Sequence, residues 1–324
     1  MKILILRFSS IGDIVLTTPV IRCLKSQLAD AEIHFATKAG FKTILENNPY
    51  IDKIHLLDKS TDTLINTLKT EKFDVVIDLH NNIRTRRIKW ALSVRSYTFN
   101  KLNVRKWLLV NLKLKTMPDV HVVDRYLETV KALGVENDNK GLDYFIPPQD
   151  IVNRNTLPSA FHNEYVAIAI GAQHATKRLP ENKLLELVQK ISLPVILLGG
   201  KEDSEMALRL ISQLPDKAAV YNACGSYKLN QSASIIQQSR YLYSHDTGLM
   251  HIGAAFQKRI ISIWGNTVPE FGMYPYQTEH VIWEKKGLSC RPCSKIGYKS
   301  CPKNHFNCMN EQSLPVKEIE TKWN

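Results

Sequence analysis

Residues suited to binding a phosphorylated ligand lie at the end of a predicted strand in the second half of the chain, where residues 244–251 read Ser-His-Asp-Thr-Gly-Leu-Met-His. We expect Asp246 to be the N-cap of the helix that follows, with Thr247 and Gly248 in its first turn. The amide N–H groups and the helix dipole then face any bound anion, and a nucleotide diphosphate fits this corner. An ordinary capped helix is the alternative interpretation.

A polar loop, Gly171–Pro180, follows the first strand of the same half and contains the adjacent cations Lys177 and Arg178. Cations here can neutralise a diphosphate without Mg²⁺ and stabilise the charge that develops on a diphosphate leaving group. A surface lysine with no ligand is the alternative. The loop after the next strand contains Glu202, a candidate for binding a ribose diol, although an acidic helix start also explains this residue.

In the first half, Gly12 and Asp13 lie at the start of the first predicted helix. A carboxylate there can accept a proton from an attacking hydroxyl group that lies within hydrogen-bond reach. Asp13 can also serve only as a helix cap, and the residue pattern by itself favours capping.

Apolar strand patterns alternate with helical patterns along the chain, which is typical of parallel sheets covered by helices. The segment Gly141–His162, rich in Pro and Asn, interrupts both patterns and is the predicted linker. We therefore expect an α/β protein of two Rossmann-like domains, 1–150 and 151–324, facing each other across a ligand-binding cleft. The predicted strands are 2–7, 32–37, 53–57, 73–79, 94–99, 165–170, 194–198, 218–221, 240–244 and 259–264. The predicted helices are 14–28, 41–46, 61–69, 82–92, 181–191, 204–214, 231–238 and 247–256.

The 324-residue chain carries 43 Lys and Arg against 31 Asp and Glu, a formal net charge of +12. Leu79–Pro118 has ten cationic residues and no acidic one, and Lys285–Asn310 is a second acid-free stretch. Two such stretches favour an anionic partner over a pair of solvated basic faces. No apolar run approaches the roughly 20 residues of a transmembrane helix, and the first residues resemble a buried strand more than a signal peptide, so we expect a cytoplasmic protein.

Four of the six cysteines crowd into the tail, where Cys290, Cys293, Cys301 and Cys308 lie close to His305 in sequence. Such a group can bind a structural Zn²⁺, but it contains only one Cys-x₂-Cys pair. Buried free thiols, or disulfides formed after cell lysis, are the alternatives. The pattern therefore leaves metal binding open.

Four segments, in the same order, resemble glycosyltransferase family 9, the ADP-heptose:lipopolysaccharide heptosyltransferases. They are Ile3–Val20, Asp78–Arg84, Ala175–Pro180 and Asp246–Ala255, and the cysteine-rich tail is similar to that of some members. The resemblance runs almost from end to end and implies a GT-B fold, with an acceptor-binding first domain and a donor-binding second domain. It also implies sugar transfer with inversion at the anomeric carbon and no required metal or other cofactor.

The resemblance assigns roles to individual residues, with Asp13 as the candidate general base and Lys177 as the catalytic phosphate-binding lysine. Together with the patterns above, it gives a donor-binding set of Gln173, Lys177, Glu202, Asp246, Thr247, Gly248 and His251. The corresponding acceptor-binding set is Ser10, Gly12, Arg84, Arg86 and Arg87.

The partners implied are a nucleotide sugar, ADP-heptose in this family, and an anionic glycolipid acceptor at the inner face of the cytoplasmic membrane. The basic stretch that begins at Arg84 then has a function, because the family's acceptor carries carboxylates and phosphates. Within it, Val104–Lys115 mixes Trp, Leu and cations as an interfacial helix does, which would make the protein peripheral to the membrane. A helix packed on the sheet explains the same pattern.

Other nucleotide-binding classes fit less well. The first turn, Phe8–Asp13, holds one glycine and lacks the Gly-x-Gly-x-x-Gly of dinucleotide-binding dehydrogenases, and the chain has no P-loop motif. A nucleotide-sugar epimerase with the same two-domain plan leaves the basic stretch without a function. No nucleic-acid recognition motif accompanies the positive charge, so we expect no nucleic-acid partner.

Overall fold

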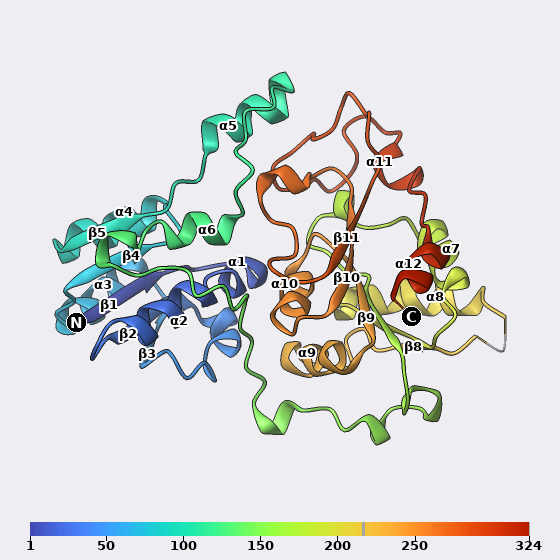
Figure 1. The fold of residues 1–324 in the computed structure, drawn as a ribbon, viewed down its shortest axis with the longest axis horizontal. Coiled ribbons are helices and arrows are strands. Elements are labelled where there is room, and N and C mark those ends of the chain that lie inside the picture. Colours follow the sequence, from blue (N-terminus) through green and yellow to red (C-terminus); the bar gives the residue numbers. More distant parts are fainter. Residues whose placement is uncertain (216–217, 324) are drawn as a thin grey trace. The chain divides into compact units, whose positions relative to one another are not determined.

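The computed structural model describes residues 1–215 and 218–323, and the chain divides into two compact α/β units (Figure 1). The first unit is Met1–Leu102 with Asp119–Pro147, and the second is Asn103–Pro118 with Pro148–Asn324. The main division after Pro147 lies close to the predicted one after residue 150. The segment Asn103–Pro118, which the sequence analysis placed in the first domain, packs with the second unit.

In the first unit, the described residues form a sheet of parallel strands in the order β3-β2-β1-β4-β5. The central strand is apolar and buried from Ile3 to Leu6, as expected of a parallel strand covered on both faces. The strands are β1 (Lys2–Leu6), β2 (Glu32–Lys38), β3 (Lys53–Leu57), β4 (Val75–Asp78) and β5 (Arg95–Thr98).

The prediction of one continuous helix over 14–28 is wrong, because the chain forms two helices here. A continuous helix would need the backbone N–H of Pro19 to bond to the carbonyl of Val15, and proline has no N–H. The Thr18 hydroxyl donates to the Val15 carbonyl oxygen instead, at 2.7 Å. The two helices are α1 (Ile11–Val15) and α2 (Thr18–Gln27).

Helices α3 (Thr61–Thr70) and α4 (Ile83–Leu92) pack over an apolar core on one face of this sheet. Their N-caps are Ser60, whose hydroxyl accepts from the Thr63 N–H at 3.1 Å, and Asn82, whose side chain accepts from the Thr85 N–H at 2.9 Å. The remaining helical segments of the unit include a 3₁₀ helix at Ala39–Ile44, where a helix was predicted, and α6 (Val122–Leu127), which was not predicted.

In the second unit, the described residues form a parallel sheet in the order β11-β10-β9-β6-β7-β8. The edge strand β11 was missed by the sequence analysis, because its ends are polar and most of it is only half-buried. The strands are β6 (Val166–Ala169), β7 (Val195–Leu198), β8 (Val220–Asn222), β9 (Tyr241–His245), β10 (Arg259–Trp264) and β11 (His280–Glu284).

The chain's last described residues close the core of the second unit. Trp323, at the end of α12, is buried and packs with Tyr241, with ring centroids 5.7 Å apart. The helices of this unit are α5 (Asn103–Trp107), α7 (Glu181–Lys190), α8 (Ser204–Ser212), α9 (Leu229–Gln238), α10 (Gly248–Ala255), α11 (Asn307–Asn310) and α12 (Val316–Trp323). Within the part of the chain that the structure describes, no helix is both long enough and apolar enough to span a bilayer.

The topology of the second sheet brings three polar loops to one edge. Strands β9, β6 and β7 are neighbours and run parallel, so the loops after their carboxyl ends lie next to one another. These loops are the ones that contain Asp246, Lys177 and Glu202. Ligands of doubly wound sheets bind at this edge.

Candidate functional site

In the second unit, the structure joins two of the predicted site residues in an ion pair. The Lys177 ammonium lies 2.6 Å from Asp246 Oδ2 and donates to the Asp246 carbonyl oxygen at 3.1 Å. The Thr267 hydroxyl donates to the same carboxylate at 3.0 Å. The side chains of Lys177 and Asp246 are 17% and 10% exposed, so the pair is largely shielded but can be reached from solvent.

The prediction that Asp246 caps the following helix is wrong. The N-cap of α10 is Thr247, and no described side chain caps the first turn that begins with Gly248. Asp246, one residue earlier, pairs with Lys177 instead, a contact between neighbouring strand ends that has no signal in local sequence. The N-terminal amides of α10 are therefore left without a side-chain acceptor, which is the property that an anion site requires.

Arg178, the second cation of the loop, has a structural role. Its guanidinium binds the Asp203 carboxylate at 2.7 Å and the Ala172 carbonyl oxygen at 2.7 Å through Nε. Asp203 is buried and also accepts the Gly200 N–H at 2.8 Å, so Arg178 ties two of the three loops together. In the loop after β7, the carboxylate that a ligand can reach is therefore that of Glu202, which is exposed. Gln173, in the loop after β6, is also exposed.

Two histidines lie at the same end of β9 and α10. His251 is buried, at 2% exposure. Burial, reinforced by the positive charges of Arg178 and Lys177, lowers the pKa of His245 to about 3. The His245 ring is therefore neutral near neutral pH, and its Nε2 accepts the Leu179 N–H at 2.9 Å. Sequence reasoning did not select His245, because a histidine at a strand end carries no signal of its partners.

The cysteine-rich tail supports the loop that carries Lys177. Thr176 and Tyr298 exchange hydrogen bonds, with the Tyr298 N–H donating to the Thr176 hydroxyl at 2.8 Å and the Thr176 N–H donating to the Tyr298 carbonyl oxygen at 3.3 Å. Gly297, with φ of +139°, presses against the His174 side chain, where an added Cβ would lie 2.5 Å from His174 Cβ. The tail is therefore part of the site's scaffold, which the sequence analysis did not predict.

A second part of the tail supports the loop that binds Asp246. The Arg291 guanidinium donates to the carbonyl oxygens of Gly265 and Thr267, at 2.6 and 2.9 Å, and binds Glu284 at 2.6 Å. Because the Thr267 hydroxyl binds Asp246, Thr267 links the tail to Asp246. Thr176, which precedes Lys177, links the tail to Lys177 in the same way.

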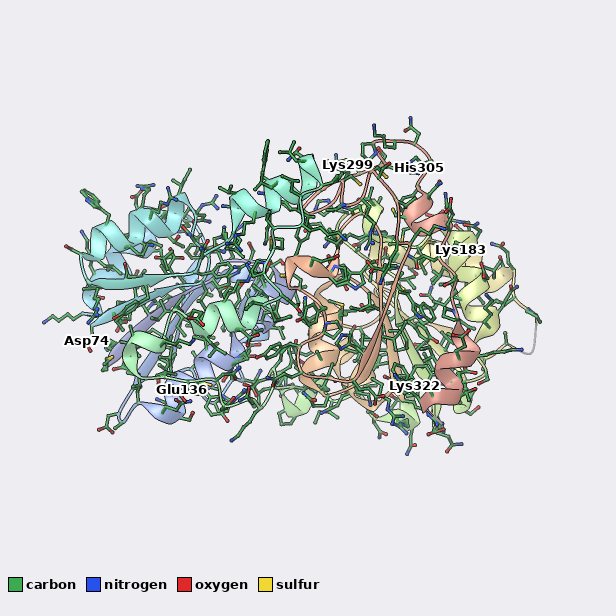
Figure 2. The ribbon with its side chains drawn as sticks, turned by 45° about the horizontal axis from the view of Figure 1, so that its top comes forward. Asp74, Glu136, Lys183, Lys299, His305 and Lys322 are labelled. Carbon is green, nitrogen blue, oxygen red and sulfur yellow. The ribbon has the colours of Figure 1, made fainter. Side chains whose placement is uncertain are left out.

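The tail thiols are free in the structure. Cys290 Sγ lies 3.8 Å from His305 Nε2, and His305 is exposed at the irregular end of this segment (Figure 2). Burial raises the pKa of the Cys308 thiol to about 12, and neighbouring thiols add to the shift. Among the described residues, three side chains that could together hold a metal ion lie close to one another in the first unit, not in the tail.

In the first unit, Asp13 faces a buried arginine. Arg7 Nη2 lies 2.6 Å from Asp13 Oδ1, while the Ser10 hydroxyl and backbone N–H donate to Asp13 Oδ2 at 2.8 and 3.2 Å. The N-cap of α1 is Ser10, and Asp13, in the first turn, makes the reciprocal capping-box contact to the Ser10 N–H, with its side chain still 25% exposed. The capping role and a role in proton transfer are compatible, because one carboxylate oxygen faces Arg7 and the other faces the helix start.

Arg7 is held by contacts on every side. Its Nε donates to the Ser9 carbonyl oxygen at 2.8 Å, and its Nη1 donates to the Leu79 carbonyl oxygen at 2.6 Å and to the Tyr126 hydroxyl at 3.0 Å. Burial alone lowers the pKa of this guanidinium, but Asp13, together with Tyr126 and Asp78, outweighs that effect and the net pKa is raised. The fixed positive charge therefore holds one oxygen of the Asp13 carboxylate in place.

Asp78 lies at the carboxyl end of β4 and organises the loop that follows. Its Oδ1 accepts the N–H groups of His80 and Asn81, at 3.1 and 2.7 Å, and its Oδ2 lies 2.9 Å from the Lys89 ammonium. Burial, followed by the charges of Arg7 and Lys101, lowers the pKa of His80 to about 4. These contacts fix the start of α4 and thereby the positions of its arginines.

The three predicted arginines of α4 are all exposed, but their surroundings differ. Arg84 lines a pocket of about 490 Å³ at the carboxyl ends of β2 and β3, together with Lys38 and Lys59. Arg87 binds Asp62 on α3 at 2.6 Å. Arg84 is therefore the one that the fold places beside other cations in a concave site.

The basic segment Asn103–Pro118 packs on its own unit through apolar contacts. Leu109 clusters with Val268 and Phe271, and the Lys113 ammonium donates to the carbonyl oxygens of Cys290 and Pro292 at 3.2 and 2.7 Å. The predicted alternative of a helix lying on the sheet of the first domain is therefore wrong.

Comparison with known proteins places these features in a family. The family model described as glycosyltransferase family 9 (heptosyltransferase) matches residues 62–303, well over half of the chain. The lipopolysaccharide heptosyltransferase 1 of Campylobacter coli is 23% identical over 297 residues, covering 82% of this chain and 84% of that protein. The lipopolysaccharide heptosyltransferase 3 of Escherichia coli K12 is 22% identical and covers 95% of this chain and 92% of that protein.

Solved structures show the same fold. The glycosyl transferase family 9 protein of Veillonella parvula is similar with a TM-score of 0.72 and 23% identity, covering 87% of this chain and 85% of that one. The E. coli heptosyltransferase WaaC with ADP is similar with a TM-score of 0.70 and 20% identity, and the match covers both chains fully.

Proposed function

The chain belongs to glycosyltransferase family 9 and is a glycosyltransferase of GT-B fold, and from this premise we propose that it transfers a heptose from ADP-heptose to the anionic core of a lipopolysaccharide. The names of its relatives support the reaction, because they are lipopolysaccharide heptosyltransferases. The structural neighbour WaaC has been solved with ADP and with ADP-2-deoxy-2-fluoro heptose, which supports the donor class.

The observation that carries the proposal is the pairing of Lys177 with Asp246 beside the uncapped start of α10. A diphosphate bound to the α10 amides would meet a lysine already directed to this corner. Lys177 then neutralises the charge that grows on the departing ADP as the bond to the anomeric carbon breaks, which makes a metal ion unnecessary for the step. Glu202 and Gln173, both exposed at the same edge, remain the proposed contacts to the rest of the donor.

Asp13 is the proposed general base. Its carboxylate takes the proton of the acceptor hydroxyl, the hydroxyl oxygen forms a bond to the anomeric carbon, and the electron pair of the broken bond leaves with ADP. One direct displacement of this kind inverts the configuration at that carbon. Arg7 and Ser10 fix the orientation of Asp13 before the step.

The acceptor's charge is matched by the pocket that Arg84 lines. Lys38, Lys59 and Arg84 offer three cations there against the single carboxylate of Asp58. Carboxylates and phosphates of a lipopolysaccharide core are suited to such a pocket, and Arg86 and Arg87 extend the positive surface along α4.

A peripheral position at the membrane is proposed from exposed apolar side chains that lie among these cations. On α4, Trp90 is 86% exposed and Ile83 is 77% exposed. On α5, Val104 and Trp107 are 72% and 56% exposed. Trp beside Lys and Arg is the composition of segments that rest at a lipid interface. We place the acceptor, on this basis, at the inner face of the cytoplasmic membrane.

The test is a transfer assay with purified protein, ADP-heptose and a heptose-deficient lipopolysaccharide acceptor, in the presence of a chelator. Mass spectrometry of the acceptor should show the gain of one heptosyl group, and nuclear magnetic resonance of the product should show inversion. Loss of transfer on chelation would refute metal independence. Failure with ADP-heptose together with transfer from another nucleotide sugar would refute the donor assignment.

A further inference from the structure

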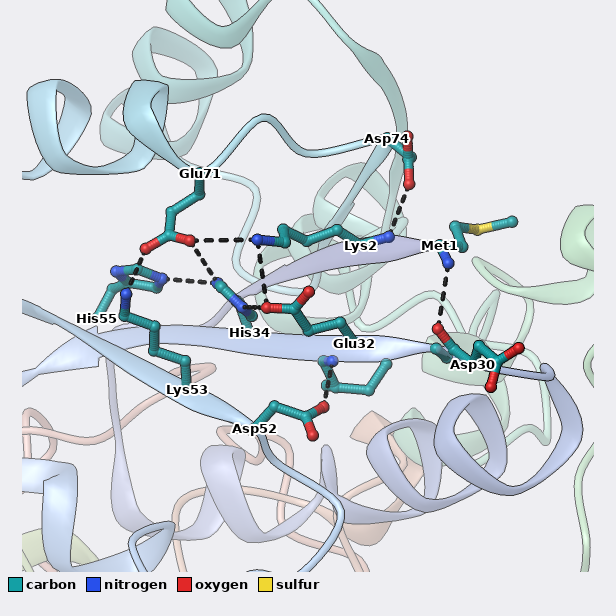
Figure 3. A network of polar contacts seen from close by, with 12 residues as sticks. Met1, Lys2, Asp30, Glu32, His34, Asp52, Lys53, His55, Glu71 and Asp74 are labelled. Atoms are coloured by element: carbon teal, nitrogen blue, oxygen red, sulfur yellow. Dashed lines mark hydrogen bonds and ion pairs between the residues drawn. The ribbon is translucent and has the colours of Figure 1, made fainter.

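Three neighbouring strands of the first unit carry polar residues near their amino ends. β1 begins with Lys2, β2 carries Glu32 and His34, and β3 carries Lys53 and His55. In the sheet, Lys2 lies opposite Glu32, and His34 lies opposite Lys53. Because alternate residues of a strand share a face, these side chains gather on one face at the amino ends of the strands (Figure 3).

Glu71 joins this group from the end of α3, which covers the same face. His34 Nδ1 lies 2.9 Å from His55 Nε2 and 3.9 Å from Glu71 Oε2, and one ligand atom from each of the three residues lies within 4.8 Å of the others (Figure 3). His34 and His55 are 0% and 4% exposed. Phe73 packs edge-on against His34, with ring centroids 5.2 Å apart, and limits the movement of the ring.

The hydrogen bonding defines which nitrogen of His34 has a lone pair. His34 Nε2 lies 2.7 Å from Glu32 Oε1, and an ionised carboxylate only accepts, so Nε2 carries the proton and Nδ1 is the acceptor of the neutral ring. His55 Nε2 therefore donates to His34 Nδ1. A histidine whose second nitrogen donates to a carboxylate is the usual arrangement of a metal ligand, because this bond orients the ring and strengthens its lone pair.

We propose that His34, His55 and Glu71 form a binding site for a divalent transition metal of the Zn²⁺ class. His34 Nδ1, His55 Nε2 and a Glu71 oxygen are the ligands, water completes the coordination, and the proton of His55 moves from Nε2 to Nδ1. Two imidazoles and one carboxylate suit Zn²⁺ and its neighbours, whereas Mg²⁺ and Ca²⁺ prefer all-oxygen sites.

The two lysines of the cluster compete with the metal for Glu71 but can yield to it. In the structure Lys53 binds Glu71 Oε1 at 2.5 Å and Lys2 approaches Glu71 Oε2 at 3.4 Å. The Lys2 and Lys53 side chains are 26% and 54% exposed, so both ammonium groups can turn into solvent when the metal takes the carboxylate. Lys2 keeps a second partner in Glu32, at 3.2 Å.

The site lies at the amino ends of the strands, on the edge of the sheet opposite to Asp13 and Arg84. A metal here links β2, β3 and the end of α3, so its effect is on the stability of the first unit and not on the chemistry of transfer. The inference is therefore independent of the proposed reaction.

The test uses the full-length protein freed of metal and titrated with Co²⁺ and Zn²⁺. Co²⁺ should give visible ligand-field absorption without the near-ultraviolet thiolate charge-transfer band that the tail cysteines would produce. Saturating Zn²⁺ should raise the melting temperature by mass action. The Cys293→Ser variant should keep both signals, and His55→Gln should lose them.

Glu32→Ala is the second variant, because the Glu32 side chain is 46% exposed and its removal leaves the core intact. It should weaken Zn²⁺ binding by about 10-fold to 100-fold, the usual effect of removing the group that orients a ligand histidine. Absence of Co²⁺ binding to the wild-type protein, binding with a thiolate band that vanishes in Cys293→Ser, or unchanged affinity in both His55→Gln and Glu32→Ala would each overturn the proposal.

Discussion

The Lys177 ammonium lies 2.6 Å from the Asp246 carboxylate, which joins the loop after β6 to the end of the neighbouring strand β9. The positive charge of Lys177 is balanced by Asp246 and anchored on its carbonyl oxygen. A bound diphosphate has to share or replace this partner. We propose that the pair is a preformed anion site whose lysine is already in place before the donor arrives.

Replacing Lys177 by alanine should weaken ADP binding by about 10-fold to 100-fold, because a charge-assisted hydrogen bond to phosphate contributes about 1.5–3 kcal/mol. Isothermal titration calorimetry with ADP, in the presence of a chelator, measures the effect. Lys190→Ala is the matched control, since Lys190 pairs with Glu186 on the outside of α7. Equal ADP affinity in the wild-type and Lys177→Ala proteins would show that the diphosphate binds elsewhere.

The support of the Lys177 loop by the tail can be tested at Gly297. Gly297→Ala should lower stability by about 1–3 kcal/mol and weaken ADP binding, because the new Cβ forces His174 and its loop to move. Gly287→Ala is the control, as Gly287 also has a positive φ, of +79°, but has nothing within 4 Å of the added Cβ. Thermal unfolding and ADP titration of both variants separate backbone strain from loop displacement. Identical behaviour of the two variants would argue against a supporting role for the tail.

The basic helix α4 allows a paired test of acceptor binding. Arg84→Ala should raise the KM for the lipopolysaccharide acceptor several-fold with little change in kcat, because it removes a cation from the pocket. Arg87→Ala should have a smaller effect, since this guanidinium is already paired with Asp62. Steady-state kinetics with varied acceptor give both values. A larger KM effect for Arg87→Ala than for Arg84→Ala would place the acceptor on the outer face of α4 and not in the pocket.

Most of the fold follows from periodicity. The predicted strand at 259–264 coincides with β10, a mostly apolar and buried run, and the predicted strand at 53–57 coincides with β3, although Lys53 and His55 interrupt its apolar pattern. The break between α1 and α2 was missed, although Pro19 marks it, and α12 was missed although Val316, Ile319 and Trp323 lie at helical spacing on its buried side.

The candidate site was only partly predictable. Strand ends pointed to Lys177 and Asp246 separately, but not to the ion pair between them. The site also depends on other contacts between residues at least 25 positions apart, namely Arg178 with Asp203 and Tyr298 with Thr176. Local sequence contains no information on such pairings. The cluster of His34, His55 and Glu71 was missed for the same reason, since its members come from two strands and a helix end.

Acid should destabilise the protein through its buried neutral histidines. The pKa of His245 is about 3 and that of His80 about 4 in the folded chain, whereas an unfolded histidine titrates near 6.5. Because the folded pKa is depressed, the stability is present above pH 6.5 and is lost progressively as pH falls towards 3. For the buried His245 this loss should reach about 2 kcal/mol by about pH 5, and it should be smaller for the partly buried His80.

His245→Gln tests this dependence, because the glutamine oxygen can still accept the Leu179 N–H. Urea unfolding of metal-free protein between about pH 7 and about pH 5 should show a shallower loss of stability in this variant. A slope identical to that of the wild type would mean that His245 titrates normally in the folded state.

The central claim is that the Asp13 carboxylate takes a proton during glycosyl transfer, and Asp13→Asn tests it most directly. The asparagine oxygen can still accept the Ser10 N–H, so the variant removes the base while keeping the cap. Single-turnover transfer from ADP-heptose to the lipopolysaccharide acceptor should slow by about 10²-fold to 10⁴-fold with ADP affinity close to that of the wild type, while the melting temperature falls because Arg7 loses its ion pair. A transfer rate within a few-fold of the wild type would contradict the account and leave Asp13 as a helix cap only.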